Sequence, residues 1–431
     1  MKYSDKTPIE YIENPEDPET DYVIVNTCGF LSSAREESEQ TLIHYDNLGK
    51  KLILMGCYVS VKDDNFLSSL KNLHSVVPFI SYSTIENLLF GKKAGLNIDA
   101  IVRAKVAMKE SKEKKLTEYL GSIGGNQRGE KAFVWKGDEV RAYIHAPFGY
   151  EYLKIAEGCD NSCTFCIIPQ IRGKQTSRKI EDVVKEVHTM LANGIREIQI
   201  IAQDTTRYGT DLYGEPRLFE LLEKIEAIPG DFKFRLYYMY PDILTLEHVQ
   251  KLKSFKKLLP YFDIPFQHSS EHILKRMGRH YDEAHVEAFL TSIRENFPDA
   301  FIRTSFIVGF PGERDEDFNH LIEFVKRHNF ESVGVFQYHD EPLAASSKLD
   351  QKVADAIVHQ CMKKLGKVLD EVYVKHTKNA RGKTFSGYIM DVKKNTCIIR
   401  REIQAPEVDE YDEVKGGAIE GNKEEVGIGQ F

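Results

Sequence analysis

Six short apolar runs of strand length alternate with stretches of helical periodicity between residues 152 and 337 of this 431-residue chain. The runs occupy residues 152–156, 197–202, 234–240, 261–266, 301–308 and 332–337. The helical patterns include residues 177–192, 218–228, 282–296 and 313–328, and a longer one follows at 352–377. Strands joined by helical crossovers form parallel sheets, so this pattern predicts an α/β fold built on an open, partial (βα)6 barrel.

The cysteines give the second constraint, because three of the seven fall within eight residues. Cys159, Cys163 and Cys166 have the spacing C-x3-C-x2-C, directly after the first strand of the barrel pattern. A structural zinc site normally takes four ligands, often as two C-x2-C pairs, and no second pair or close histidine follows. Three thiolates suit a [4Fe–4S] cluster with one open iron, at the strand end where α/β barrels carry their active sites. A zinc site with a distant fourth ligand is the alternative.

Composition excludes several classes of protein. The chain has 58 basic and 66 acidic side chains, and its net charge of -8 argues against nucleic-acid binding through bulk charge. Hydrophobic residues at 42% and charged residues at 29% are typical of a soluble globular protein. No apolar run approaches the roughly 18 residues that span a membrane, and the acidic first residues do not resemble a signal peptide. We expect a cytoplasmic protein without membrane segments.

Two β-then-α units are expected at the start of the chain. The strands are predicted at 22–26 and 51–55, and the helices at 32–48, capped by Ser32 or Ser33, and near 63–73. Cys28 and Cys57 each follow one of these strands, and neighbouring parallel strands would bring the two loops to one edge. From spacing alone, a ligand pair and two buried packing thiols are equal alternatives. Residues 105–115 and 121–130 are charged or glycine-rich and are expected to be linker.

The cysteine segment, with Phe165 before its last thiol, resembles the signature of radical S-adenosylmethionine enzymes. Over nearly the whole chain the sequence is similar to the methylthiotransferases of that superfamily. The similar segments are residues 26–38, 56–57, 154–178, 201–209, 263–268 and 303–313. The resemblance implies an N-terminal α/β methylthiotransferase domain at 1–135, a radical S-adenosylmethionine core at 141–377 and a small TRAM-like β-barrel at 378–431. Both end domains are expected to be truncated.

The resemblance also implies two [4Fe–4S] clusters and S-adenosylmethionine as cofactors. Cys159, Cys163 and Cys166 would hold the catalytic cluster, which binds S-adenosylmethionine at its open iron and generates a 5′-deoxyadenosyl radical. Cys28 and Cys57 would ligate an auxiliary cluster that supplies sulfur, while a second S-adenosylmethionine supplies the methyl group. An electron donor such as flavodoxin is implied as a partner.

Several other polar residues are candidates for the site. Gln203, Asp204 and Arg303 lie at or near strand ends, where they could fix the ribose and carboxylate of S-adenosylmethionine, or could be polar residues satisfied inside the barrel. Gln267 and His268 are weaker candidates. Cys361 and Cys397 are expected to be packing residues, in a helix and a strand respectively.

Two substrates are the main contenders within the family. The ribosomal-protein branch modifies an aspartate β-carbon in a small-subunit protein of the decoding site, and it is favoured by the phrases at 26–30, 202–204 and 404–409. From residue 402 onward the chain has nine acidic and two basic side chains, which suits a basic ribosomal protein or the ribosome as partner. A tRNA adenosine is the alternative substrate, although a tRNA-binding domain would be expected to be basic.

A third hypothesis is a truncated single-cluster protein without sulfur transfer. The family's auxiliary cluster uses three N-terminal cysteines, and this chain has two, Cys28 and Cys57, in that region.

Overall fold

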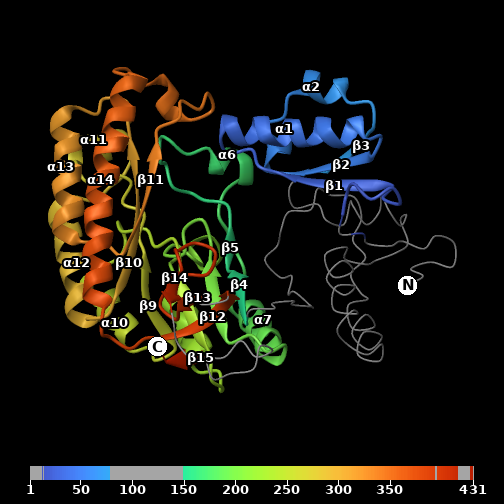
Figure 1. Ribbon diagram of the computed structural model, residues 1–431. Coiled ribbons are helices and arrows are strands. Elements are labelled where there is room, and N and C mark those ends of the chain that lie inside the picture. Colours follow the sequence, from blue (N-terminus) through green and yellow to red (C-terminus); the bar gives the residue numbers. More distant parts are fainter. Residues whose placement is uncertain (1–11, 13, 78–148, 394–395, 416–427, 431) are drawn as a thin grey trace. The chain divides into compact units, whose positions relative to one another are not determined.

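The computed structural model describes residues 12, 14–77, 149–393, 396–415 and 428–430 (Figure 1). The chain divides into two compact units. The first comprises residues 157–161 and 166–193 together with the described part of 1–145, and the second comprises the described parts of 146–156, 162–165 and 194–431. The linker expected over 105–115 and 121–130 lies outside the described residues, as does the expected domain boundary between 135 and 141.

The first unit contains a three-stranded parallel sheet in the order β1-β2-β3. Its strands are β1 (Tyr22–Thr27), β2 (Lys51–Gly56) and β3 (Leu73–Val76). Helix α1 (Ser32–Asn47), the 3-10 turn η1 (Cys57–Ser60) and helix α2 (Asp64–Ser69) connect them. Leu42 of α1 packs into a buried core with Leu52 and Leu54 of β2, so the apolar residues predicted to form these βα units do hold them together.

Two details at the helix ends differ from the prediction. Ser32 is the first residue of α1 and the cap position falls on Leu31, with no side-chain cap hydrogen bond, so the predicted serine cap is wrong. Helix α2 ends at Ser69 and Leu73 begins β3, so the predicted helix runs too far. Asp63 caps α2, since its carboxylate accepts hydrogen bonds from the first-turn amides.

The rest of the first unit follows the cysteine segment. It contains helix α6 (Ile168–Arg172) and helix α7 (Ile180–Ala192). The short strands β5 (Ala156–Glu157) and β6 (Thr176–Ser177) pair with each other. Helix α7 begins three residues later than predicted because 176–177 is extended.

The second unit is built on the six parallel strands that the sequence predicts, and their order in the sheet is β11-β10-β9-β8-β7-β4 (Figure 1). The strands are β4 (Tyr150–Lys154), β7 (Glu197–Ile201), β8 (Lys233–Leu236), β9 (Leu258–Asp263), β10 (Phe301–Val308) and β11 (Ser332–Gln337). Strand β8 stops four residues before the predicted end, and Tyr238, with φ of 53°, has left-handed backbone there.

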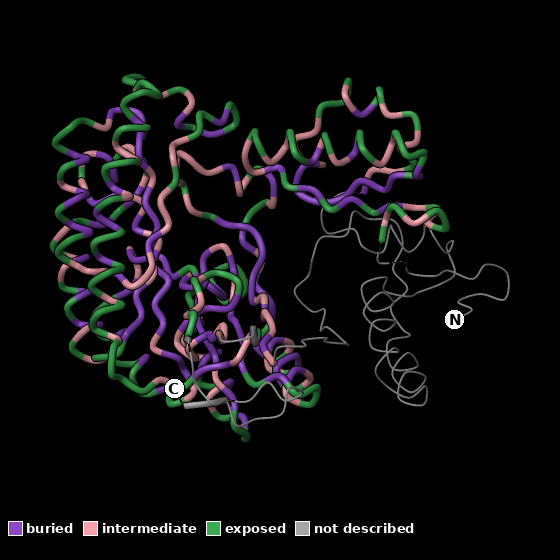
Figure 2. The backbone as a smooth tube through the Cα atoms, viewed as in Figure 1, coloured by how far each residue is buried: buried purple, intermediate pink, exposed green. Residues whose placement is uncertain are grey.

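Each strand of this sheet divides its side chains between two faces. On one face Ile198, Ile200 and Phe234 are fully buried, and the ring of Phe262 meets that of Phe297 just after helix α12. The helices of this unit are α8 (Thr210–Tyr213), α9 (Leu218–Glu226), α10 (Leu246–Lys253), α11 (Glu271–Arg276), α12 (Glu283–Asn296), α13 (Asp315–His328), η2 (Ala345–Lys348) and α14 (Asp355–Ala380). Figure 2 shows the strands mostly buried and the helices exposed along their outer sides.

The other face of the sheet carries polar and aromatic side chains and is covered by the C-terminal segment. Tyr237, Tyr261 and Phe301 form a buried cluster with Ala405, and Ile403 packs against it. The segment belongs to an antiparallel sheet in the order β14-β13-β12-β15. Its strands are β12 (Ser386–Lys393), β13 (Thr396–Arg401), β14 (Asp412–Lys415) and β15 (Ile428–Gln430). The β-structure that the resemblance implies for the C-terminal segment is present as this antiparallel sheet.

None of the helices in the described ranges combines the length and the apolar character that a bilayer crossing needs.

Candidate cluster and cofactor site

Cys159 and Cys166 lie in the first unit, in a loop shaped by hydrogen bonds. Gly158 has φ of 76°, and the Cys159 amide donates to the carbonyl oxygen of Gly173 at 3.2 Å. The sulfur of Cys159 accepts a hydrogen bond from the Asn161 amide, and that of Cys166 accepts one from the Ile168 amide, both at 3.4 Å. Backbone N–H groups aimed at sulfur stabilise thiolates and tune iron–sulfur clusters.

Cys163 lies in the second unit, where its neighbours anchor it to the turn after α11. The Thr164 amide donates to the carbonyl oxygen of Met277 at 2.9 Å, and the adjacent Phe165 packs against the cluster of Ile273, Met277 and Phe310. The Cys163 sulfur lies 3.5 Å from the hydroxyl of Tyr240 and 3.5 Å from Nη1 of Arg279.

Tyr240 and Arg279 were missed in the sequence analysis. Burial raises the pKa of Tyr240, so this hydroxyl stays protonated at neutral pH. Arg279 is 4% exposed. Arg279 lies in a segment of mixed charge after a helix, and no sequence motif singles it out there. Only the tertiary contact with Cys163 identifies it.

Asp204 is the third residue of the loop after β7, and its side chain is buried. Its Oδ1 accepts hydrogen bonds from the amide and hydroxyl of Thr206, at 3.0 and 2.5 Å, and Oδ2 lies 3.4 Å from Nε of Arg207. The carboxylate therefore shapes its own loop, which corresponds to the internally satisfied alternative. Gln203, the preceding residue, is half-buried.

Arg303 of β10 pairs with Asp263, the last residue of β9. Nη1 of Arg303 lies 2.7 Å from Oδ1 of Asp263, and Oδ2 accepts from the Tyr238 amide at 3.1 Å. Burial raises the pKa of Asp263, although Arg303 and the amide oppose the shift. Burial disfavours the charge on Arg303, but Asp263 and nearby groups raise its pKa above the usual value. The pair keeps a guanidinium at this end of the sheet.

The loops that carry Cys28 and Cys57 lie together, as the parallel strands predict. A Cβ atom built on Gly29 would be 2.7 Å from the backbone carbonyl of Cys57, so only glycine allows this approach. Ser38 of α1 bonds both the amide and the carbonyl of Cys28, at 3.2 and 3.1 Å. Cys28 is exposed, whereas Cys57 is buried.

Arg172, at the end of α6, contacts the Cys57 loop within the same unit. Its Nη1 lies 2.8 Å from Glu157, and its guanidinium also interacts with the thiol of Cys57. Burial opposes the charge of Arg172, but Glu157 and Cys57 raise its pKa above the ordinary value. The neighbouring carbonyl of Ile171 accepts a hydrogen bond from the Ser60 hydroxyl at 3.1 Å.

The weaker candidates Gln267 and His268 follow β9. Gln267 has φ of 70° and forms a backbone bridge to β10. His268 is buried, and its Nδ1 accepts from the Ser270 amide at 3.0 Å while Nε2 lies 3.7 Å from Oε1 of Glu313. His268 is therefore buried with Nδ1 hydrogen-bonded and with Nε2 without a hydrogen-bond partner among the described residues.

All seven cysteines are described and none forms a disulfide. Cys361 is half-buried in α14 and Cys397 in β13, where they were expected as packing residues. Within the described parts of the chain, no three His, Cys, Asp or Glu side chains gather closely enough to hold a metal ion. The three-thiol cluster site therefore remains a prediction from spacing, supported by the local hydrogen bonds at each sulfur.

Two family matches agree with this organisation. Residues 153–325, which contain the three clustered cysteines and most of the parallel sheet, match the Radical SAM superfamily. Residues 6–78, which contain Cys28 and Cys57, match the Uncharacterized protein family UPF0004.

Curated relatives align with most of the chain. A protein of Carboxydothermus hydrogenoformans named ribosomal protein uS12 methylthiotransferase RimO is 37% identical over 411 residues, covering 93% of this chain and 86% of the relative. A protein of the same name from Clostridioides difficile is 35% identical, covering 92% and 84%. The chain belongs to the family of ribosomal protein uS12 methylthiotransferases, within the radical SAM superfamily.

Solved structures with weaker similarity include the radical S-adenosylmethionine methyltransferase TsrM from Kitasatospora setae. It is 13% identical with a TM-score of 0.48, over 73% of this chain and 61% of that chain. Coproporphyrinogen III oxidase from Escherichia coli is 18% identical with a TM-score of 0.40, over 51% and 52%.

Proposed function

We propose that this protein is a radical S-adenosylmethionine methylthiotransferase that adds a methylthio group to the β-carbon of an aspartate in ribosomal protein uS12. The observation that carries the proposal is the set of three cysteines, none in a disulfide, after the first strand of the parallel sheet, in a chain that aligns almost throughout with relatives named for this reaction. The proposed domains are 1–135, 141–377 and 378–431.

The residues around the three thiols fit an iron–sulfur cluster. Amide donors face the sulfurs of Cys159 and Cys166, and a guanidinium faces that of Cys163. Such donors stabilise sulfur that carries negative charge. When bound, the cluster supplies the electron that cleaves S-adenosylmethionine, and a donor such as flavodoxin is proposed to provide that electron.

The proposed contacts to S-adenosylmethionine involve the loop after β7 and Arg303, the third residue of β10, which lies beside the end of β9. Arg303, fixed by Asp263, would hold the carboxylate of the methionine moiety, because a guanidinium offers a planar fork that matches a carboxylate. Gln203 would contact the ribose. Asp204 acts on the cofactor through the loop whose shape it sets, since its carboxylate is already bonded to Thr206 and Arg207.

The auxiliary cluster is proposed to be held in part by Cys28 and Cys57, whose loops meet at the end of β1 and β2. Arg172 would place a guanidinium beside the Cys57 sulfur, where its positive charge suits a negatively charged cluster.

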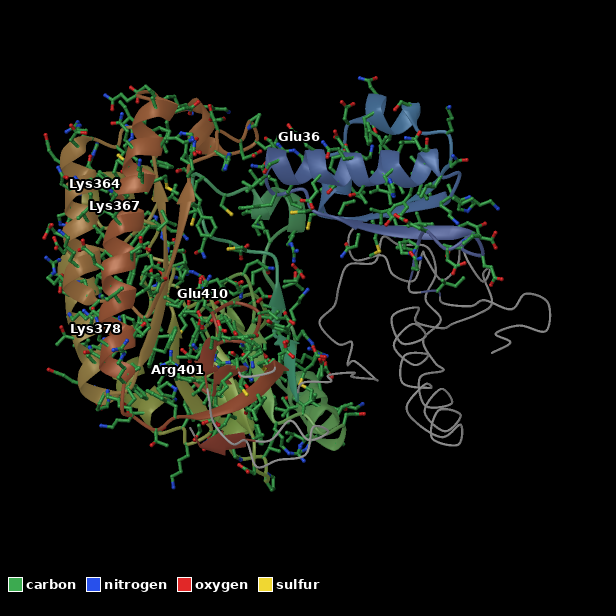
Figure 3. The ribbon with its side chains drawn as sticks, viewed as in Figure 1. Glu36, Lys364, Lys367, Lys378, Arg401 and Glu410 are labelled. Atoms are coloured by element: carbon green, nitrogen blue, oxygen red, sulfur yellow. The ribbon has the colours of Figure 1, made fainter. Side chains whose placement is uncertain are left out.

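The substrate protein is proposed to dock against the acidic C-terminal segment. Glu407, Glu410 and Glu413 are exposed there, and Figure 3 shows Glu410 on this part of the molecule. Complementary charge steers partners together and selects among them, so this surface suits a basic ribosomal protein.

The test is anaerobic reconstitution of the full chain, with iron and sulfide counts, followed by reaction with uS12 peptide and S-adenosylmethionine. We expect about eight irons per chain, two cubanes' worth, and a methylthio group on one aspartate by mass spectrometry. About four irons, cleavage of S-adenosylmethionine and unmodified peptide would identify a single-cluster protein without sulfur transfer.

A tRNA adenosine is the second candidate substrate. The observation that favours it is a row of exposed lysines on α14, including Lys364, Lys367 and Lys378 (Figure 3). Phosphate contacts by lysine weaken steeply as salt rises, so binding of tRNA with a strong salt dependence that is lost in Lys364→Glu/Lys367→Glu would support this candidate. Methylthiolation of tRNA but not of uS12 would establish it.

A further inference from the structure

Arg279 is a buried cation at the third thiol of the proposed cluster site. It lies in the turn after α11, and its guanidinium is held from three sides. Nη2 donates to the carbonyl oxygen of Pro265 at 2.5 Å, and Nε lies 3.5 Å from the hydroxyl of Tyr281. The guanidinium carbon lies 3.8 Å from the ring centroid of Tyr240, which is close enough for a strong cation–π contact. The remaining group, Nη1, faces the sulfur of Cys163 at 3.5 Å.

Arg279 differs from the other buried arginines because no carboxylate pairs with it among the described residues. Each of the other three is ion-paired: Arg178 with Glu186 at 2.6 Å, and both Arg235 and Arg400 with Glu197. No carboxylate among the described residues lies within ion-pair distance of Arg279, whose partners are a carbonyl, a phenol and a thiol.

Asp242 is the carboxylate that acts on Arg279 from farther away, but it is already paired. Its Oδ2 lies 3.0 Å from Nη2 of Arg207. Arg207 also lies 3.4 Å from Asp204, so Asp242 acts on both Arg207 and Arg279, and no carboxylate among the described residues pairs directly with Arg279.

A guanidinium does not lose its proton inside proteins, and an unpaired buried charge is costly. An arginine in this position therefore favours an anion beside it. Among the described residues, the acidic groups within hydrogen-bond distance are the thiol of Cys163 and the phenol of Tyr281, and of the two only the thiol belongs to the C-x3-C-x2-C segment. A [4Fe–4S] cluster on three thiolates carries one negative charge when oxidised and two when reduced. Such a cluster would place negative charge beside Arg279.

We propose that Arg279 is the counter-charge of the cluster held by Cys159, Cys163 and Cys166, and that it raises the reduction potential of that cluster. This inference rests on the proposed function. Because the reduced cluster carries more negative charge than the oxidised one, a fixed cation beside one of its sulfurs stabilises the reduced state more.

The surroundings of Arg279 keep the guanidinium in place in both redox states. The stack on Tyr240 and the bond to Pro265 fix two sides of the planar group, so little rotation is available when the cluster changes charge. Lysine would retain the charge without the fork or the stack, whereas glutamine would retain much of the length without the charge. The two variants therefore separate charge from shape.

The experiment is an anaerobic redox titration of the reconstituted full chain, monitored by electron paramagnetic resonance of the reduced cluster, with dithionite as reductant. Wild type is compared with Arg279→Gln and Arg279→Lys. The matched control is Arg276→Gln, which removes a charge three residues away, where the guanidinium faces Pro311 and Asp350 and is partly exposed. Iron per chain is counted for every sample.

At a fixed ambient potential we expect Arg279→Gln to lower the ratio of reduced to oxidised cluster about tenfold, which is about 59 mV for a one-electron couple. Arg279→Lys should change the ratio less, and Arg276→Gln should leave it unchanged. An Arg279→Gln cluster that is fully loaded and titrates at the wild-type potential would overturn the inference.

Iron content decides the case in which Arg279→Gln does not load. If Arg279→Lys then loads as wild type does, the charge is what the cluster needs and the inference holds. If lysine fails as glutamine does, Arg279 acts through its shape and the inference is wrong. A wild-type chain that assembles no cluster on the three cysteines contradicts the proposed function itself, whereas a loaded cluster indifferent to Arg279 contradicts the inference alone.

Discussion

Glu197 and Arg400 are 203 positions apart in the chain, yet Oε2 of the glutamate lies 2.7 Å from Nη2 of the arginine. The same carboxylate pairs with Arg235 at 2.5 Å, and all three side chains are buried. Arg235 also donates to the carbonyl oxygens of Glu402 and Gln404. One carboxylate at the start of β7 thus fixes the C-terminal segment to the face of the parallel sheet.

Replacement of Glu197 by glutamine should destabilise the protein strongly. The variant would leave Arg235 and Arg400 buried without a negative partner, a situation that costs about 3–5 kcal/mol in free energy of unfolding. Denaturant unfolding followed by circular dichroism would measure the change. Glu223→Gln is the control, because Glu223 pairs with Lys251 on the surface and should change stability by less than about 1 kcal/mol. A Glu197→Gln protein as stable as the control would contradict the importance of the buried pair.

The contribution of Glu197 should depend on pH in a specific direction. Burial favours the neutral acid, but Arg235 and Arg400 outweigh it and hold the pKa of Glu197 below the ordinary value. A lowered folded-state pKa adds stability above the unfolded pKa of about 4.3, and that stability is lost as pH falls through the folded value. The difference in unfolding free energy between wild type and Glu197→Gln should therefore be constant from neutral pH to about 5 and shrink in stronger acid. A difference that widened on acidification would be inconsistent with this sign.

Gly158→Ala should impair cluster assembly without removal of any ligand. Gly158 has φ of 76°, and a Cβ atom there would overlap the carbonyl oxygen of Lys174, so the loop that carries Cys159 must move. We expect reduced iron per chain after reconstitution, with the far-ultraviolet circular dichroism unchanged. Gly366→Ala in α14 is the control, since nothing lies within 4 Å of its added Cβ and alanine favours helix by about 1 kcal/mol. Full iron loading in Gly158→Ala would show that the loop tolerates the shift.

Cys163→Ala should abolish reductive cleavage of S-adenosylmethionine while the protein stays folded. Cys163 is half-buried and its thiol is small, so the expected loss is that of a cluster ligand. Product 5′-deoxyadenosine, measured by chromatography after dithionite reduction, is the readout. Cys361→Ala, which removes a half-buried thiol from α14, should cleave at the wild-type rate. Cleavage that persists in Cys163→Ala would sink the ligand assignment.

The six-stranded sheet could be predicted because its strands are apolar runs of the right length. Because the strands are parallel, their carboxyl ends then lie at one edge of the sheet. The predicted end of strand β8 was wrong because the residues there have the composition of a strand but not its backbone conformation. Residues 237–240 are apolar and aromatic, yet Tyr238 has left-handed backbone and β8 ends at Leu236. The three clustered cysteines could be identified from the sequence because they lie within one short segment, where their spacing forms a motif.

The contacts that balance buried charge were beyond sequence reasoning. The position of Asp204 in a motif predicts a cofactor contact, but it does not predict the contacts of the carboxylate with Thr206 and Arg207. Arg279 and Cys163 are 116 positions apart, and no periodicity relates them. A charged residue gains its role from a partner elsewhere in the chain, and one sequence does not name that partner.

The C-terminal segment that covers the aromatic face of the sheet also limits how this family can exchange parts. A C-terminal sheet transplanted from a relative with a different substrate would have to bring carbonyl groups for Arg235 and a cation for Glu197, or the recipient would carry an unbalanced charge under its new cap. The stability of the barrel is thereby tied to the chemistry of the C-terminal segment, so a change in one is constrained by the other.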